Sequence, residues 1–219
     1  MGLTPVSVSS MKVLSEPVAI SGPDARRPVL GGRAGYALVA AVVGLCLFAS
    51  VAPSPLYGTY ARLWHFSALT LTLVYATYAF GVLVTLLLAG GASDQVGRRP
   101  VLMVSLGVLM LSTVLYAVAD SVAWLFAARA LQGLATGAAL STASASMLDF
   151  HPRRDAARVG QLNGIASAAG VGLGALVSAA LVQAAVAPRV LPYVLLLVLF
   201  AAAFVGSAYR PEPLAGRTR

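Results

Sequence analysis

The sequence consists of long apolar segments separated by short polar ones. The apolar segments are rich in Leu, Ala and Val and contain few charged residues. Each reaches or exceeds the roughly 18 residues that a helix needs to cross a hydrocarbon core of about 30 Å. The segments cover residues 36–53, 68–91, 101–119, 122–148, 159–186 and 190–209. This pattern predicts six transmembrane helices.

The same segments argue against a membrane β-barrel. Barrel strands are short and alternate strictly between apolar and polar residues, whereas these segments are long and carry Gly at helix-packing spacings. We therefore expect an all-α membrane protein with one six-helix domain over residues 36–209. Residues 1–35 are polar and rich in Pro and Ser, so we expect a disordered cytoplasmic tail there rather than a cleaved signal. Residues 210–219 are expected to form a short cytoplasmic tail.

Composition and charge support this topology. The chain is 59% hydrophobic and only 10% charged, and its net charge is +8. Twelve of the fifteen basic residues lie in alternate polar segments, which by the positive-inside rule places both termini in the cytoplasm. We expect a multi-pass protein of a bacterial inner membrane, surrounded by lipid and with no nucleic-acid partner. The twelve residues are Lys12, Arg26, Arg27, Arg33, Arg98, Arg99, Arg153, Arg154, Arg158, Arg210, Arg217 and Arg219.

The polar segment GGASDQVGRRP, between the second and third spans, concentrates charge. Asp94 follows the C-terminal end of one helix, and Arg98 and Arg99 precede the N-terminal end of the next. Each charge has the sign that the nearby helix dipole disfavours. These side chains are therefore expected to have partners elsewhere in the molecule.

This loop resembles the signature between the second and third helices of the major facilitator superfamily of secondary transporters. The matching positions are Gly90, Asp94, Gly97, Arg98 and Arg99. The resemblance implies that Asp94 meets the N-terminal end of a helix from the other half of the transporter. It also implies that Arg98 pairs with Asp149 at the end of the fourth span, as part of a cytoplasmic gate.

The fourth span resembles a second signature of that family, in which an Arg is followed by Gly and small residues. Here Arg129, Gln132, Gly133 and Gly137 take these positions. Arg129 lies seven residues into the span, about 10 Å along the helix, where a charge costs about 2.5–3.5 kcal/mol on insertion scales. We expect Arg129 and Gln132 to face a water-filled cavity or a buried acceptor, with a role in coupling. The alternative is an Arg that extends to the outer interface.

A third family signature is incomplete. In the fifth span, antiporters of the family carry G-x-x-x-G-P, but here Ala175 stands where the Pro belongs. This motif therefore does not support antiport. The small residues at spacings of four still predict close helix packing. The glycines concerned are Gly133, Gly137, Gly160, Gly164, Gly170 and Gly174.

Several polar residues are candidates for contact with a solute. In the family, the first and fourth spans line the cavity. Two tyrosines of the first span, after a predicted bend at APSPLYGTY, are therefore candidates in addition to Arg129 and Gln132 of the fourth span. Tyrosines near membrane ends are also common interfacial anchors, and that alternative stays open. No Asp or Glu lies deep in a span, so the coupling ion stays undetermined. The candidates are Tyr57, Tyr60, Tyr75, Tyr78, Gln161 and Asn163.

Catalytic and cofactor motifs are missing from the sequence. Six spans also occur in rhomboid-type proteases, but their G-x-S-G motif is absent, and His65 and His151 both fall in loops. Two isolated His and the single Cys46 make no metal site, and there is no phosphate-binding loop. We expect neither an enzyme nor a cofactor. A six-helix channel lacks any supporting motif.

The resemblance covers about residues 36–210, which corresponds to the N-terminal half of such a transporter. We expect transport of a small solute by alternating access, with export of a drug-like or metabolite compound as the favoured direction. A second six-helix half, from a separate chain or a second copy, is the expected partner. The alternative is a truncated, non-transporting fragment or scaffold.

Overall fold

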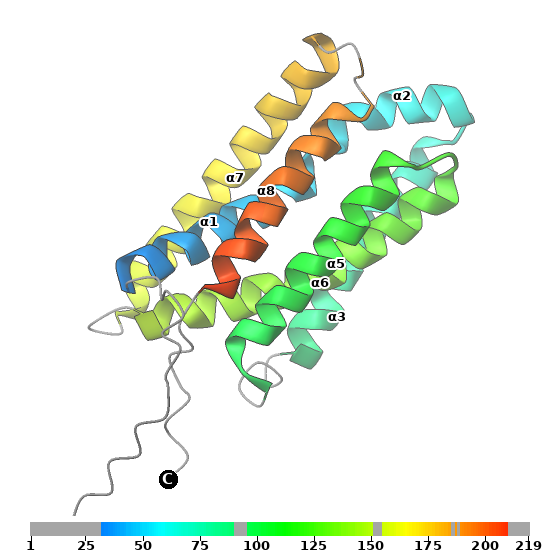
Figure 1. Ribbon diagram of the computed structural model, residues 1–219. Helices are drawn as coiled ribbons and strands as arrows, with labels where there is room; N and C mark the ends of the chain where they lie inside the picture. Colours follow the sequence, from blue (N-terminus) through cyan, green and yellow to red (C-terminus); the bar gives the residue numbers. More distant parts are fainter. Residues whose placement is uncertain (1–31, 90–95, 151–154, 185–186, 188, 210–219) are drawn as a thin grey trace, which may run out of the picture.

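The computed structural model describes residues 32–89, 96–150, 155–184, 187 and 189–209, and the secondary structure of these residues is helical throughout (Figure 1). This confirms the all-α fold class. The predicted cytoplasmic tails lie almost entirely outside these ranges. The helices are α1 (Gly32–Val51), α2 (Ser54–Trp64), α3 (Ala68–Ala89), α5 (Arg98–Ala117), α6 (Val122–Phe150), α7 (Ala156–Ala184) and α8 (Leu191–Ala208).

Five membrane spans are supported by helix length and apolar composition. They are Ala34–Trp64, Ala68–Leu88, Arg98–Ala117, Ala156–Gln183 and Leu191–Ala208. Helix α6 has 29 residues, enough to cross a membrane, but carries many small polar side chains. It packs against α1, α3, α5 and α7, so much of its surface faces protein. The sixth span and the cytoplasmic location of the termini stay predictions.

The first span differs from its predicted boundaries. The sequence pattern predicted a span over residues 36–53. In the structure the helix begins at Gly32 and, after a break, continues as α2 to Trp64. The predicted bend is present between Val51 and Ser54. Pro53 has no N–H to continue the helical ladder, but its φ of −73° and ψ of −14° are close to helical. The chain therefore changes direction briefly and resumes as a helix.

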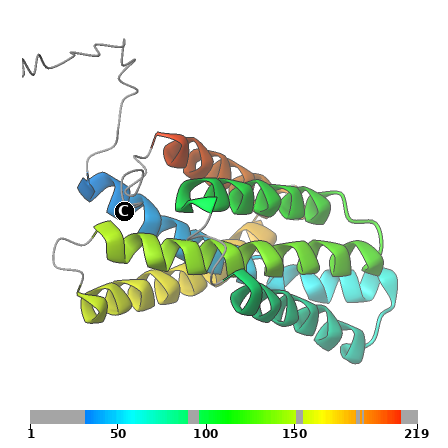
Figure 2. The ribbon, with the colours of Figure 1, turned by 90° about the horizontal axis from the view of Figure 1, so that it is seen from below.

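The helices run alternately up and down, so their ends gather on two sides of the bundle. The starts of α1, α5 and α7 and the ends of α3, α6 and α8 lie on the same side (Figures 1 and 2). Buried residues of α1, α5, α6 and α8 form most of the core. Cys46 is part of it and is fully buried, as expected for a small core residue.

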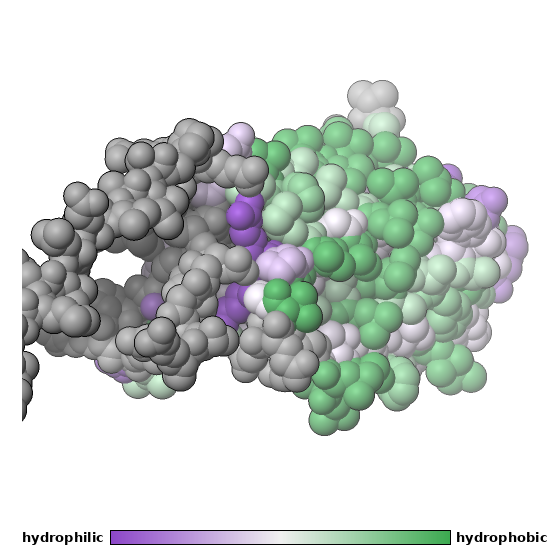
Figure 3. Space-filling model, turned by 60° about the horizontal axis from the view of Figure 1, so that its bottom comes forward, coloured by the Kyte–Doolittle hydropathy of each residue, from purple (hydrophilic) through white to green (hydrophobic). Residues whose placement is uncertain are grey.

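Two helices are covered much less than the others. Only 17% of the apolar window of α3, and 17% of that of α7, is buried within the bundle. Figure 3 shows a face on which hydrophobic residues form a broad green surface, with hydrophilic residues mainly toward its ends. Such a surface suits lipid or another apolar helix.

Candidate functional site

An ion pair joins the ends of two helices at the side where α5 begins. The Nη1 atom of Arg98 lies 2.7 Å from Oδ2 of Asp149, near the end of α6. Both side chains are largely buried, with 16% and 11% exposed. Just before this pair, Gly97 has a φ of 97°, a conformation that a residue with a Cβ rarely adopts. The expected contact between Arg98 and Asp149 is therefore present.

Arg99 contacts a different helix from its neighbour. Its Nη2 donates a hydrogen bond to the backbone carbonyl of Ala208, the last residue of α8. A cation at a helix C-terminus satisfies a free carbonyl and is favoured by the helix dipole. The dipole argument indicated that Arg99 needs a distant partner, but the sequence did not indicate α8. The remaining signature residues, Gly90 and Asp94, lie outside the described residues.

Arg129 is completely buried in the first half of α6 and hydrogen-bonded to neutral groups. Its Nε donates to Oη of Tyr57 at 2.6 Å. Its Nη1 donates to the carbonyl of Ser50 at 2.9 Å and to Oε1 of Gln132 at 2.7 Å. Of the alternatives left open by the sequence, the structure shows the buried acceptor. The extension of Arg129 to the outer interface is wrong, because these acceptors lie inside the bundle.

Four aromatic rings surround the same guanidinium. The distances from Cζ of Arg129 to the ring centroids are 5.4 Å for Tyr57, 5.2 Å for Tyr75, 5.4 Å for Tyr78 and 5.8 Å for Tyr116. Each lies within the roughly 6 Å over which a ring attracts a cation. These contacts, together with the hydrogen bonds, offset the cost of burying the charge. We call Arg129 and these four rings the tyrosine cage.

The hydrogen bonds of Gln132 follow from the proline in the first span. In a continuous helix, the N–H of residue 53 would donate to the carbonyl of Ala49, but Pro53 has none. Nε2 of Gln132 donates to this carbonyl at 2.8 Å. The carbonyl of Ser50, also in the last turn of α1, accepts a hydrogen bond from Nη1 of Arg129. The pair on α6 therefore satisfies backbone groups that the helix break leaves free. A proline inside an apolar span was the sequence signal for such a need.

Four of the predicted packing glycines allow close helix contact. A Cβ on Gly133 would collide with the Tyr78 carbonyl, and one on Gly170 with the carbonyl of Gly44. At Gly137 it would lie 2.9 Å from the Val82 carbonyl, and at Gly174 2.6 Å from that of Phe48. The α3–α6 and α1–α7 contacts therefore depend on glycine.

The packing role predicted for Gly160 and Gly164 is wrong within the described residues. A Cβ at either position has nothing within 4 Å. Both lie closer to the start of α7 than Gly170 and Gly174, which contact α1. The spacing of four was therefore correct as a helical pattern but did not identify the part of the helix that is packed.

The candidate solute-contacting residues do not form one surface. Tyr57 and Tyr60 are buried, each 1% exposed, so neither presents a free surface in this conformation. Tyr75 is 39% exposed. Asn163 is half-buried and donates to Oγ of Ser144 at 3.1 Å. Of the rest, Tyr78 is half-buried and Gln161 is exposed.

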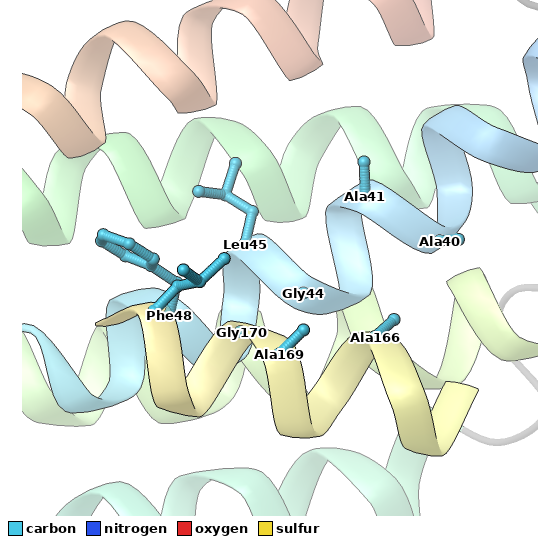
Figure 4. Close-up of a pocket in the computed structure, with 9 residues that line it drawn as sticks. Ala40, Ala41, Gly44, Leu45, Phe48, Ala166, Ala169 and Gly170 are labelled. Carbon is cyan, nitrogen blue, oxygen red and sulfur yellow. The ribbon is translucent and has the colours of Figure 1, made fainter. Parts of the chain in front are cut away.

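An apolar groove lies between α1 and α7. Its volume is about 410 Å³, and Gly44, Leu45 and Phe48 line it from α1, opposite Ala166, Ala169 and Gly170 on α7 (Figure 4). None of these side chains is a hydrogen-bond donor or acceptor. The groove offers van der Waals contact alone.

The chemistry available at the site is electrostatic. Arg129 stays protonated under ordinary conditions, so it supplies positive charge and hydrogen-bond donors rather than acid–base catalysis. In the described ranges, no three His, Cys, Asp or Glu side chains are close enough to hold a metal ion. An interior charge held by neutral acceptors suits a binding or conformational role.

Comparison with known proteins places this arrangement in a family. Over 64 residues the chain is 41% identical to multidrug resistance protein D of Escherichia coli strain K12. The aligned part covers 29% of this chain and 16% of that protein. The sequence profile of the Major Facilitator Superfamily matches residues 35–219, which include every described helix except the first three residues of α1. The chain therefore belongs to the Major Facilitator Superfamily.

Proposed function

We propose that this chain is a six-helix unit of a secondary transporter, which moves a small solute across a bacterial inner membrane by alternating access. Its family supports transport, and the name of its relative, a multidrug resistance protein, supports export of a drug-like compound. In this proposal α6 is the sixth span, and both termini are cytoplasmic.

The observation that carries the proposal is the Arg98–Asp149 ion pair. It joins the start of α5 to the end of α6 on the side where α1 begins and α8 ends. Alternating access requires two states that differ in discrete contacts at each side of the membrane. A partly buried ion pair at a helix end can be made in one state and broken in the other. We assign it to a gate on the cytoplasmic side.

A second six-helix unit is the proposed partner, from another chain or a second copy. The support is the low coverage of α3 and α7. Transporters of this type hold their solute between two such units near the middle of the membrane. In the alternative the chain is a scaffold or fragment without transport activity, and α3 and α7 face lipid.

The test is dye export from bacteria that lack their own multidrug pumps. Cells expressing the chain are loaded with anionic, neutral and cationic fluorescent dyes, and retention is compared with cells carrying an empty vector. Export of at least one dye is expected, and Asp149→Asn should reduce it severalfold, because Arg98 then loses its charged partner. Asp155→Asn is the control. Asp155 pairs with Arg158, three residues later at the same helix end, and 39% of its side chain is exposed.

Two results would contradict the proposal. Equal export by the Asp149→Asn and Asp155→Asn variants, at equal amounts in the membrane, would contradict the assignment of the Arg98–Asp149 ion pair to a gate. Retention of every dye by cells with normal amounts of the protein would favour the scaffold alternative.

A further inference from the structure

The charge of Arg129 is not neutralised by any carboxylate in the described part of the bundle. The acidic residues of this part are Asp120, Asp149 and Asp155, which lie at or beyond helix ends. Asp149 and Asp155 contact other arginines. The hydrogen bonds from Nε and Nη1 of Arg129 all go to neutral oxygens, so dipoles stabilise the cation but leave a net charge of one.

One wall of the tyrosine cage is open. Tyr75 is 39% exposed, and Tyr78 is half-buried beside it on α3. Oη of Tyr75 donates to Oγ of Ser54, the first residue of α2, at 3.0 Å. Tyr57 packs edge-on against Tyr75, with ring centroids 5.2 Å apart, and holds the ring in place. A flat apolar group can therefore contact the exposed part of Tyr75, whose ring centroid lies 5.2 Å from Cζ of Arg129.

A tyrosine ring normally attracts cations, but here the two effects oppose each other. Cation–π attraction is worth about 0.5–1 kcal/mol at an exposed ring. The guanidinium already lies 5.2 Å from the centroid of Tyr75, and it repels a second cation placed over the open face. The opposite sign applies to an anion, which Arg129 attracts through the ring. The balance therefore favours negatively charged aromatic solutes.

We infer that the surface formed by Tyr75, Tyr78 and Ser54 in front of Arg129 binds aromatic monoanions and discriminates against aromatic cations of the same size and shape. This inference rests on the proposed transport function and names its substrate class.

The size of the preference follows from the separation of the charges. Van der Waals contact with the ring adds about 3.5–4 Å to the 5.2 Å between ring and guanidinium, which places the bound charge about 9 Å from Arg129. Coulomb's law then gives an anion-to-cation affinity ratio of about 500-fold at an effective dielectric constant of roughly 20, the value typical of charges near a protein surface. Cation–π attraction at the ring favours the cation by about two- to fivefold, which reduces the ratio to about 100-fold. A ratio of at least about fivefold is expected.

The test compares two ions of opposite charge and closely similar size. Tetraphenylborate and tetraphenylphosphonium have nearly the same size and shape. Their affinities are measured by equilibrium dialysis against the full chain in micelles of a non-ionic detergent, and each is corrected for binding to empty micelles, because the dipole potential of a lipid bilayer itself favours anions. The borate should bind at least about fivefold more tightly. Equal affinities, or tighter binding of the phosphonium, would overturn the inference.

A charge-only substitution locates the effect. Ser54→Asp places a carboxylate beside the hydroxyl of Tyr75, at the first turn of α2 where the helix dipole favours an acid. It should abolish or reverse the preference. Ser54→Asn, which has nearly the same size and shape as the Asp variant but no charge, should change the affinities for both ions alike. Arg129→Gln is an independent test, because it removes the positive charge itself. It should reduce the anion-to-cation affinity ratio to about one or below. An unchanged ratio in either Ser54→Asp or Arg129→Gln would refute the site.

Binding at Tyr75 can be distinguished from binding in the groove between α1 and α7. Ala169→Phe fills that groove, and it should leave the affinities unchanged if the ions bind at Tyr75. Loss of binding in that variant would assign the ions to the groove instead. Because the measurement is equilibrium binding to the chain alone, it is independent of dye export. Failed export with intact anion preference would contradict the proposed function, and intact export without the preference would contradict only this inference.

Discussion

Gln132 offers a direct test of how the first span and α6 depend on each other. We consider Gln132→Leu, which keeps the volume of the side chain and removes its polar atoms. The carbonyl of Ala49 loses its donor at 2.8 Å, and Arg129 loses an acceptor at 2.7 Å. Gln132 is 2% exposed, so water does not readily replace either contact. The variant should therefore be less stable.

The magnitude comes mainly from these two contacts, since the third, from Oη of Tyr116 to Oε1 of Gln132, is long at 3.4 Å. A buried polar group left without a partner costs about 1–3 kcal/mol, whereas hydrogen bonds in membrane bundles average about 0.6 kcal/mol and reach about 1.7 kcal/mol. We expect a loss of about 2–3 kcal/mol in the free energy of unfolding. About 1 kcal/mol of this belongs to the Ala49 carbonyl, because the bond to Arg129 is charge-assisted and stronger.

The share of the Ala49 carbonyl can be isolated with a second substitution. Pro53→Ala restores an N–H at the position that would donate to this carbonyl, and the nearly helical φ and ψ of Pro53 suit that bond. In the Pro53→Ala background, Gln132→Leu should cost about 1 kcal/mol less. The double-mutant cycle therefore predicts a coupling energy of about 1 kcal/mol between residues 53 and 132.

The measurement is unfolding in mixed detergent micelles, with rising sodium dodecyl sulfate, followed by far-UV circular dichroism and by the fluorescence of Trp64 and Trp124. Gln161→Leu is the matched control, since Gln161 is exposed on α7, and it should change stability little. Additive effects of Pro53→Ala and Gln132→Leu, to within about 0.3–0.5 kcal/mol, would refute the reasoning. Gln132 would then not replace the missing N–H.

Three other predictions concern helix contacts. Gly133→Ala should destabilise the bundle by about 1–3 kcal/mol in the same unfolding assay, because its Cβ meets the backbone of α3. Gly164→Ala, with open space around it, should be neutral or slightly stabilising. Equal effects of the two substitutions would contradict the packing assigned to these glycines. Arg98→Gln and Asp149→Asn should show a coupling energy of about 1–2 kcal/mol in a double-mutant cycle, and a coupling near zero would show that the ion pair does not stabilise this conformation. Arg99→Gln should speed amide hydrogen exchange in the last turn of α8 relative to its middle, and unchanged exchange would exclude a capping role.

The contacts at the ends of α5 divide into those that sequence reasoning reached and those that it missed. The Arg98–Asp149 pair was predicted, because both residues match a recognisable pattern at the ends of neighbouring spans. The contact of Arg99 with Ala208 was not, because its acceptor is a backbone carbonyl, and a carbonyl has no signature in the sequence. Which carbonyl lies within reach depends on how α5 and α8 pack.

The sequence by itself determined the helical class, the approximate positions of the apolar segments and the break in the first span. These depend on local chemistry: the length of apolar runs, and the missing N–H of Pro53. Only the tertiary structure decided which face of each helix is packed. The polar residues of α7 do not mark out one face, so Gly164 and Gly170 look alike in the sequence, yet of these two only Gly170 contacts α1. Likewise, the burial of Arg129 among neutral oxygens and tyrosine rings requires α1, α2, α3, α5 and α6 together.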